Sequence, residues 1–302
     1  MNQQFLTELK AVTAENRIFT DEPMKKHTTF RVGGPGDILV QPKGTELAAV
    51  IRLCRKYDVP YQVIGNGSNL LVGDRGIRGL VIEMLSKEDE ICVEDDCITV
   101  GAGMLLSKTA NRAAEHGLTG MEFAAGIPGR IGGAVVMNAG AYGGEMKDIL
   151  TAVTVLDQEG NEKILSAEEL ELGYRTSCIL KKGYIVTGAK IKLKHGEETA
   201  IRARMEELKK QRVEKQPLEY PSAGSTFKRP EGYFAGKLIM DAGLRGYLVG
   251  EAQVSEKHCG FVINRGNATA ADVRTLMQNV ADIVEEKFGV RLEPEVKMIG
   301  EF

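Results

Sequence analysis

The sequence predicts an α+β protein with two domains. The chain has 302 residues, which exceeds one typical domain and is enough to bury a substantial core. Apolar residues recur at helical spacing in some segments and form short strand-like runs in others. The polar segment 195–199 separates these segments from a last third with a charged helix, a long loop and a long amphipathic helix. We therefore expect one domain over 1–197 and another over 198–302.

The first domain is expected to begin with an amphipathic helix. Phe5, Leu6, Leu9 and Val12 lie at helical spacing without a continuous apolar core, which favours a helix over a signal peptide. Mixed strands and helices follow. The predicted strands are 28–32, 37–41, 61–64, 80–83, 91–94, 98–101, a hairpin of 152–157 with 162–165, and an edge-type strand at 184–193; the predicted helices are 45–57 and 104–116.

The second domain is expected to combine helices with a few strands. Thr269 and Asp272 have the spacing of a capping box, and Gly289 marks the end of the helix that they begin. A long loop is expected at 218–232. The other predicted elements are helices at 199–213 and 233–242 and strands at 247–254, 260–264 and 290–299.

Composition argues against several kinds of partner and site. The net charge of −3 and the absence of Trp argue against nucleic acid or an anionic membrane as the main partner. No segment approaches the ~20 apolar residues of a membrane span. The five cysteines are odd in number and form no C-x-x-C pair, so we expect neither a disulfide framework nor a metal site. We expect a cytoplasmic protein, and no obligate protein partner is evident.

A glycine-rich stretch at 126–145 is the main candidate for ligand binding. It holds seven glycines in twenty residues, and Arg130 is the only charged side chain between Glu122 and Glu145. Glycine lets a ligand approach the backbone closely, and exposed N–H groups without nearby carboxylates can cradle a pyrophosphate. A close crossover of buried elements is an equally good interpretation of such a stretch taken alone.

A second candidate loop lies at 65–80. It begins like the dinucleotide fingerprint G-x-G-x-x-G, but Leu70 occupies the last position and further glycines follow too soon for a long helix. The turn at 101–106 also misses that fingerprint, and 232–238 is one residue short of a P-loop. The loop 65–69 can wrap a phosphate with amides and short polar side chains, although an ordinary hairpin is the better interpretation of this loop taken alone.

Six segments together resemble the UDP-N-acetylenolpyruvoylglucosamine reductase family, in family order over nearly the whole chain. They are HTTFRVGGP (27–35), IGNGSNLLV (64–72), GIPGRIGGAVVMNAGAYGGE (126–145), GYRTS (173–177), AGSTFKRP (223–230) and LEPEV (292–296). The resemblance implies an FAD-binding domain of the vanillyl-alcohol-oxidase/PCMH type, with two α/β subdomains that meet near residue 84, and a C-terminal α+β substrate domain. The 39 residues between Arg175 and Lys215 are too few for the insertion of the longer subgroup, so the chain resembles the shorter, type II subgroup.

The resemblance also implies cofactors and their residues. FAD is the expected cofactor, and NADPH is the expected co-substrate. The expected substrate is UDP-N-acetylglucosamine-enolpyruvate, an intermediate of peptidoglycan synthesis, and NADPH and this substrate share one site. The residues expected to contact FAD are Gly65, Asn66, Gly67, Ser68, Asn69, Ile127, Pro128, Gly132, Gly133, Asn138, Gly140 and Ala141.

The reaction implied by the resemblance needs a cation, a stabilising group and a proton donor. Arg175 matches the arginine that faces the substrate carboxylate, since its planar fork suits bidentate pairing. Ser225 matches the proton donor. Glu295, which is chosen over Glu293 on motif position, matches the glutamate that stabilises the enol-like intermediate. We suppose that burial lets its carboxyl group donate to the developing enol and not repel the negative charge there. Without the motifs, these would be read as a surface arginine, a turn serine and a strand-end carboxylate.

Substrate contacts and alternative functions complete the expectations. Lys215 is expected at the substrate diphosphate, with Tyr142, Tyr174 and Arg229 as neighbours; Arg229 stands where some family members have Asn. One alternative is an alcohol oxidase of the same flavin fold, which would need a base rather than a proton donor. The other is a nucleotide-sugar-binding protein without catalysis.

Overall fold

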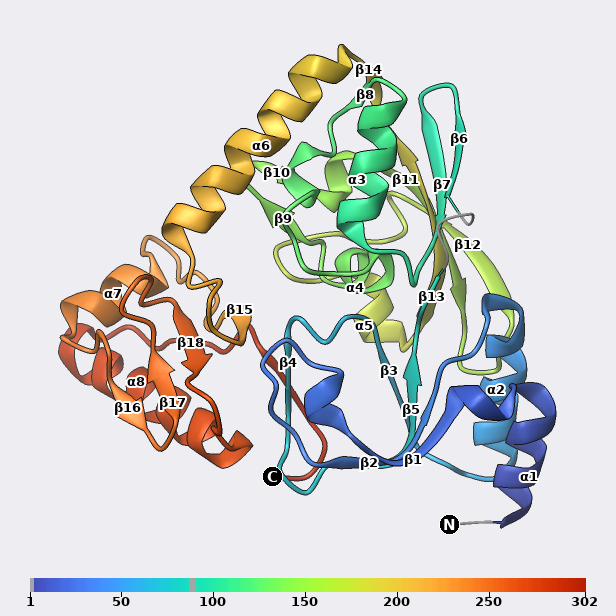
Figure 1. Cartoon of the computed structure of the whole chain (residues 1–302), viewed down its shortest axis with the longest axis horizontal. Helices are drawn as coiled ribbons and strands as arrows, with labels where there is room; N and C mark the ends of the chain where they lie inside the picture. The colour runs from blue at the N-terminus through green and yellow to red at the C-terminus, as the bar shows by residue number, and fades with distance from the viewer. Residues whose placement is uncertain (1–2, 87–90) are drawn as a thin grey trace. The chain divides into compact units, whose positions relative to one another are not determined.

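The computed structural model describes residues 3–86 and 91–302 (Figure 1). The chain divides into two compact units, each built from three segments. Unit 1 comprises Met1–Phe19, Leu39–Gly65 and Leu80–Arg212, and unit 2 comprises Thr20–Ile38, Asn66–Gly79 and Val213–Phe302. Short segments from the first eighty residues therefore fold with the C-terminal third. The predicted division into domains over 1–197 and 198–302 rests on the polar segment 195–199, and it stays a prediction.

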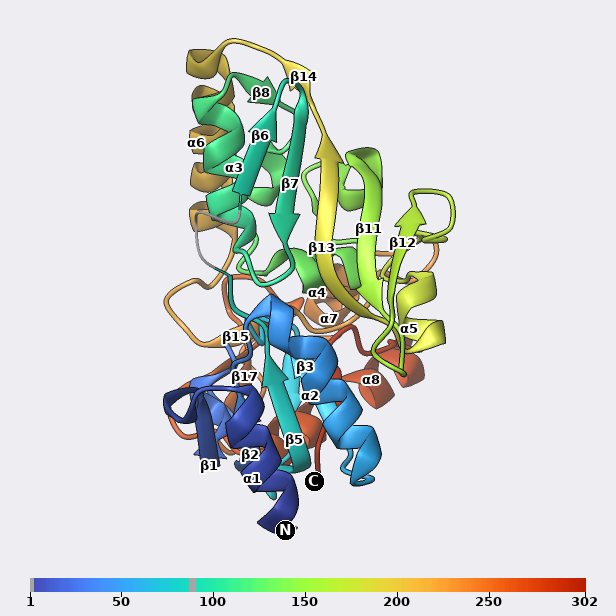
Figure 2. The ribbon, with the colours of Figure 1, turned by 90° about the vertical axis from the view of Figure 1, so that its right-hand side faces the viewer.

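Unit 1 is organised around a five-stranded antiparallel sheet of order β12-β11-β13-β7-β6 (Figure 2). Its core combines aliphatic side chains of the sheet with those of helices α3 and α4, including Ile98, Leu106, Ile131 and Val153. The strands are β6 (Ile91–Glu94), β7 (Cys97–Gly101), β11 (Leu150–Leu156), β12 (Glu162–Ser166) and β13 (Ile185–Lys192), and the helices are α3 (Leu106–Glu115), α4 (Ile131–Val136) and α5 (Cys178–Lys182).

Strand β13 lies at the centre of this sheet, between β11 and β7, so the prediction of an edge strand was wrong. The prediction rested on alternation of polar and apolar residues. Along β13, Ile185, Val186, Ala189 and Ile191 are buried, while Lys190 and Lys192 are exposed. An antiparallel sheet with one solvated face gives the same alternation in a central strand as in an edge strand.

A four-stranded sheet of order β1-β2-β5-β3 carries the N-terminal part of the chain. Strands β3 and β5 pair in parallel, from Tyr61 opposite Leu80 to Ile64 opposite Glu83. Helices α1 and α2 pack together in unit 1, and α2, the helix predicted at 45–57, buries Leu47, Val50, Ile51, Leu53 and Cys54. The bounds are α1 (Gln3–Val12), β1 (Ile18–Pro23), β2 (Pro35–Val40), α2 (Gly44–Lys56), β3 (Tyr61–Ile64) and β5 (Ile77–Glu83).

The predicted strand at 28–32 is absent, and that segment forms a turn instead. Arg31 has a φ of 54°, in the left-handed region, which an extended strand cannot contain. The Thr28 hydroxyl donates to the Val32 carbonyl at 3.2 Å and closes the turn. The apolar and β-branched residues of 28–32 therefore form a turn and not a strand, and the Phe30 side chain of this turn is fully buried.

Unit 2 packs α7 and α8 with a four-stranded antiparallel sheet of order β15-β18-β17-β16. The predicted capping box is confirmed, because Thr269 Oγ1 accepts from the Asp272 N–H at 3.0 Å and Gly289 ends α8 at a φ of 68°. Strand β19 pairs in parallel with β4. The bounds are β4 (Leu70–Val72), β15 (Ser222–Ser225), α7 (Ala235–Asp241), β16 (Leu248–Val249), β17 (Ala252–Val254), β18 (Phe261–Asn264), α8 (Ala270–Phe288) and β19 (Lys297–Ile299).

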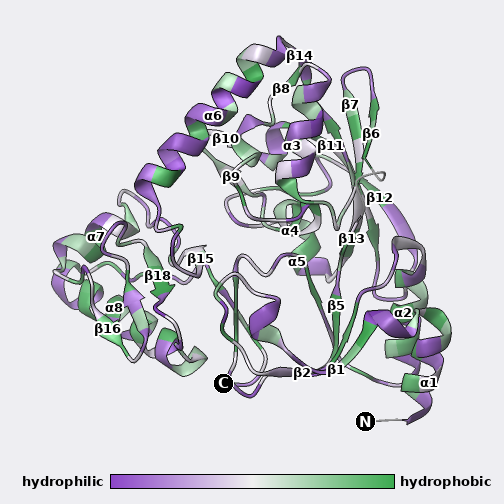
Figure 3. Cartoon of the chain, viewed as in Figure 1, coloured by the Kyte–Doolittle hydropathy of each residue, from purple (hydrophilic) through white to green (hydrophobic). Residues whose placement is uncertain are grey.

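Several smaller predictions need correction. The segment 247–254 is a hairpin, because Gly250 turns the chain at a φ of 53°. The segment 218–232 contains β15, and only Lys297–Ile299 of the predicted last strand is extended into a sheet. The chain is completed by α6 (Glu198–Lys215), which is mostly hydrophilic (Figure 3), and by the short pairs β8 (Leu118–Thr119) with β14 (Lys194–His195) and β9 (Gly140–Ala141) with β10 (Gly144–Glu145). Across residues 3–86 and 91–302, every helix is too short or too polar to span a lipid bilayer.

Gly67→Ala is expected to destabilise the protein strongly. Gly67 has a φ of 59°, and a Cβ there would lie 2.1 Å from the His27 carbonyl oxygen. Left-handed strain and a backbone clash together should lower the free energy of unfolding by at least about 2 kcal/mol. Urea titration of Gly44→Ala is the matched control, because a Cβ at Gly44 meets nothing within 4 Å. Equal stability of the two variants would contradict the strained geometry.

Asp157→Asn is expected to lower stability in a pH-dependent way. The Asn161 N–H, with Lys163 and the Glu159 N–H, lowers the pKa of Asp157 to about 2. A lowered folded-state pKa stabilises the protein above the unfolded value of about 3.9, and this stabilisation is lost as the pH falls through about 2. The melting temperature of the variant should therefore fall below that of the wild type at pH 7, and the difference should shrink toward pH 2. A difference that is constant over this range would contradict the charge-based explanation.

Candidate active site

The glycine-rich stretch of unit 1 folds onto the turn at 101–106. The Gly132 N–H donates to the Ala102 carbonyl, the Ile131 N–H to the Met104 carbonyl, both at 2.8 Å, and the Leu106 N–H to the Gly129 carbonyl at 3.0 Å. A Cβ on Gly132 would lie 3.1 Å from the Ala102 Cβ, so glycine permits this close approach. The close crossover that the sequence suggested is therefore present, and Gly133 beside it is exposed, with nothing within 4 Å of where a Cβ would lie.

Arg130 lies at the centre of this arrangement. Its Nη1 donates to the Gly103 carbonyl at 2.6 Å, and its aliphatic stem lies beside Gly65, where a Cβ would be 3.5 Å from the Arg130 Cβ. Burial lowers the pKa of Arg130, and the nearby Glu83 opposes this shift. Its Nε is buried and has no hydrogen-bond partner within the described chain. A buried donor without a partner is costly, so this position suits an acceptor atom of a ligand.

Arg175 lies at the tip of a tight turn in unit 1. Gly173 and Thr176 pair across the turn through both backbone hydrogen bonds, at 3.1 and 3.3 Å. Arg175 has a φ of 54°, and its guanidinium lies 5.4 Å from the centre of the Tyr174 ring. A non-glycine residue in the left-handed region carries backbone strain that the surrounding structure maintains.

Ser225 and Glu295 are brought together in unit 2 through Thr226. The buried Thr226 accepts the Glu295 N–H on its carbonyl at 2.8 Å, and its hydroxyl accepts the Val262 N–H at 2.9 Å. Ser225 ends strand β15 opposite Phe261, and its side chain is exposed. Apart from its place in AGSTF, nothing in the sequence marks Thr226 as important, because its role depends on hydrogen bonds with Val262 and Glu295, which lie far along the chain.

Glu295 and Glu293 occupy different environments although they lie only two positions apart. Glu295 is 8% exposed, and the Asn69 side-chain amide donates to its carbonyl at 3.2 Å. Glu293 is exposed and pairs with Lys228 at 2.9 Å, which lowers the pKa of Glu293. The structure thus buries the residue that motif position selected. Asn69 also joins the loop 65–69 to strand β19, because its carbonyl accepts the Lys297 N–H at 2.9 Å.

The predicted substrate residues divide between the two units. Tyr142 and Tyr174 are exposed in unit 1, and both lie in turns; Tyr142 has a φ of 53°. Lys215, the last residue of α6, is exposed in unit 2. The Arg229 guanidinium lies 4.0 Å from the centre of the exposed Phe234 ring. Loop residues dominate this set, as is common for binding residues.

Arg212 is a further candidate that sequence reasoning missed. It lies on α6 and is half-buried against the glycine stretch, since a Cβ on Gly126 would be 3.3 Å from the Arg212 Cδ. Burial lowers the pKa of Arg212, and Tyr142 opposes this shift. The sequence offers no signal for this position, because Arg212 is one of many charged residues along a highly charged helix.

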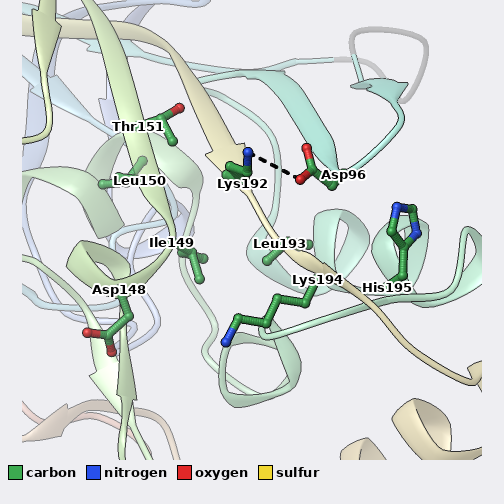
Figure 4. A pocket seen from close by; sticks show the side chains of 9 residues that line it. All are labelled: Asp96, Asp148, Ile149, Leu150, Thr151, Lys192, Leu193, Lys194 and His195. Atoms are coloured by element: carbon green, nitrogen blue, oxygen red, sulfur yellow. Dashed lines mark ion pairs between the residues drawn. The ribbon is translucent and has the colours of Figure 1, made fainter.

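A pocket of about 530 Å³ lies elsewhere in unit 1 (Figure 4). Lys192 pairs with Asp96 there at 3.3 Å. None of the predicted site residues lines this pocket. Its lining consists of Asp96, Asp148, Ile149, Leu150, Thr151, Lys192, Leu193, Lys194 and His195.

Comparison with known proteins decides the family. Residues 216–299 match the family model for the C-terminal domain of UDP-N-acetylenolpyruvoylglucosamine reductase, and 37–166 match an FAD binding domain. The UDP-N-acetylenolpyruvoylglucosamine reductase of Agathobacter rectalis is 57% identical, with 100% of both chains covered, and that of Caldanaerobacter subterraneus is 52% identical, also with 100% of both covered. The chain belongs to this reductase family. A crystal structure of the Thermus caldophilus reductase matches 92% of this chain and 97% of its own, with 41% identity and a TM-score of 0.79.

These matches confirm the resemblance, the predicted fold class and the enzyme class. The protein is an oxidoreductase with FAD as its cofactor, and 37–166 contains both the loop 65–69 and the whole glycine stretch. The residues present fit FAD, because the buried Arg130 Nε offers an unused donor on a side chain beside Gly65, and the space beside the exposed Gly133 is open within 4 Å of where a Cβ would lie. FAD supplies acceptor oxygens, including a pyrophosphate, that such donors bind.

Proposed function

We propose that this enzyme reduces the enolpyruvyl double bond of UDP-N-acetylglucosamine-enolpyruvate to give UDP-N-acetylmuramate for peptidoglycan synthesis in the cytoplasm. When bound, FAD would take a hydride from NADPH and deliver it to the terminal vinyl carbon of the substrate. The relatives' name states the same substrate. The observation that carries the proposal is that the Glu295 N–H donates to the carbonyl of Thr226, the residue that follows Ser225, so the exposed serine and the buried glutamate lie on neighbouring backbone segments.

The protein groups serve the second half of this reaction. Arg175 binds the substrate carboxylate, into which negative charge spreads as hydride arrives. Glu295 stabilises the enol-like intermediate, and Ser225 donates the proton to the neighbouring carbon. A serine hydroxyl is a weak acid, so this transfer relies on the strong basicity of that carbon.

Binding roles follow the same division of residues. Lys215, Tyr142, Tyr174 and Arg229 contact the substrate, with Lys215 at the diphosphate. The domain over 1–197 holds FAD, and 198–302 holds the substrate. The residues proposed to contact FAD are Gly65, Asn66, Gly67, Ser68, Asn69, Ile127, Pro128, Gly132, Gly133, Gly140 and Ala141. Asn138, which the resemblance also implied, is 1% exposed and uses its side-chain amide in hydrogen bonds within the chain, so no FAD contact is proposed for it.

The test is turnover of NADPH with the purified, FAD-loaded protein. UDP-N-acetylglucosamine-enolpyruvate should drive NADPH oxidation and give a product heavier by about two mass units, the mass of the two added hydrogens. UDP-N-acetylglucosamine, which lacks the vinyl group, should not. Oxygen acting as the faster acceptor would favour an oxidase, and a protein that binds the sugar nucleotide without flavin would favour a binding function.

A further inference from the structure

Asn138 is buried at the junction of the glycine stretch and the turn that carries Arg175. It is 1% exposed and has a φ of 42°, in the left-handed region that asparagine tolerates better than most residues. Its side chain makes three hydrogen bonds: Nδ2 donates to Glu145 Oε2 at 2.7 Å and to the Gly173 carbonyl at 3.2 Å, and Oδ1 accepts the Lys147 N–H at 2.9 Å. All of these contacts lie within unit 1.

These contacts use both ends of the side-chain amide. Two acceptors face the NH₂ group and one N–H faces the oxygen, so an amide satisfies all three partners. A carboxylate could accept from Lys147 but could not donate to Glu145 or Gly173. The Gly173 carbonyl accepts two hydrogen bonds, one from the Asn138 side-chain amide and one from the Thr176 N–H. The base of the turn is therefore fixed from both sides.

We propose that Asn138 is a positioning residue for Arg175, and that it acts by anchoring the base of the turn at Gly173. This inference rests on the proposed role of Arg175 at the substrate carboxylate. Arg175 stands two residues beyond Gly173 in a strained conformation that surrounding contacts must maintain. The second anchor is the Ser177 hydroxyl, which donates to the Val136 carbonyl at 2.7 Å, so α4 and the segment that follows it hold the turn at both ends.

Asn138→Asp tests the inference, because aspartate tolerates the left-handed backbone and keeps the Lys147 contact. The affinity of the enzyme for the enolpyruvate substrate should fall roughly 10- to 100-fold, the scale of a misplaced binding group. The affinity for UDP-N-acetylglucosamine, which has no carboxylate for Arg175, should stay near the wild-type value. Equal losses for both ligands would overturn the inference, since a general loosening of the fold affects both.

A double-mutant cycle with Arg175→Ala separates positioning from independent effects. If Asn138 acts through Arg175, Asn138→Asp should add little to the loss caused by Arg175→Ala. Additive losses would overturn the inference. If Arg175→Ala alone leaves substrate affinity unchanged, the proposed role of Arg175 fails; if it lowers the affinity while Asn138→Asp does not, only the positioning role fails.

The double variant Asn138→Asp with Glu145→Gln keeps the test decisive if Asn138→Asp folds poorly. The glutamine amide introduced at position 145 can donate to the carboxylate introduced at position 138. The hydrogen bond between positions 138 and 145 is then restored with donor and acceptor exchanged. The side chain at position 138 still has no N–H to donate to the Gly173 carbonyl. The melting temperature should therefore recover while the selective loss of enolpyruvate affinity persists. Recovery of both would overturn the inference, because the Glu145 contact, and not the anchor at Gly173, would then position the turn.

Discussion

Ser225→Ala should leave flavin reduction by NADPH at the wild-type rate and slow flavin reoxidation by the enolpyruvate substrate by about 10² to 10⁴-fold. The hydroxyl is exposed at the end of β15, next to Gly224 with a φ of 75°, and supports no hydrogen bond that the fold depends on among those described. Its removal should therefore cost proton donation and little stability. Anaerobic stopped-flow absorbance of the flavin measures the two half-reactions separately.

Ser222→Ala is the matched control in the same strand. Its carbonyl, which the substitution keeps, accepts the Thr29 hydroxyl at 2.6 Å. Both half-reactions of this control should stay close to the wild-type rates. If Ser225→Ala slows both half-reactions equally, Ser225 has a structural role and the proton donor is another group.

Glu295→Gln should also impair reoxidation selectively, by about 10² to 10³-fold. Glutamine keeps the size of the side chain and the backbone contacts with Thr226 and Asn69, but it removes the ionisable group. The flavin should still be reduced by NADPH, and stopped-flow absorbance again resolves the two steps.

Glu293→Gln is the internal comparison for this prediction. Glu293 is exposed and pairs with Lys228, and a surface ion pair contributes little to stability. Its substitution should change neither half-reaction by more than about threefold. A larger effect at Glu293 than at Glu295 would reverse the assignment made from motif position and burial.

The sequence predicted local elements well where a single physical signal was sufficient. The capping box at Thr269 and the turn at Gly289 located both ends of α8, and period-3.6 spacing located α2. The position of β13 within its sheet could not be predicted in this way, because one-sided burial gives a central strand the alternation of an edge strand. Strand order depends on pairing between distant segments, which local patterns do not record.

The candidate site shows the same limit. The motifs selected Glu295 over Glu293, and the structure places the selected residue in the buried position. The contacts that organise the site, however, join residues far apart in sequence, as when Asn69 donates to Glu295 or Arg130 to Gly103. The composition of the compact units was equally hidden, since Asn66–Gly79 folds with the C-terminal third.

The most direct test is an anaerobic, two-step titration of the FAD-loaded enzyme followed at the visible flavin band. NADPH should bleach the flavin, and one equivalent of UDP-N-acetylglucosamine-enolpyruvate, added in the absence of oxygen, should restore the colour rapidly with UDP-N-acetylmuramate as the product. A flavin that stays bleached after substrate is added, and regains its colour only when oxygen is admitted, would contradict the proposed reaction.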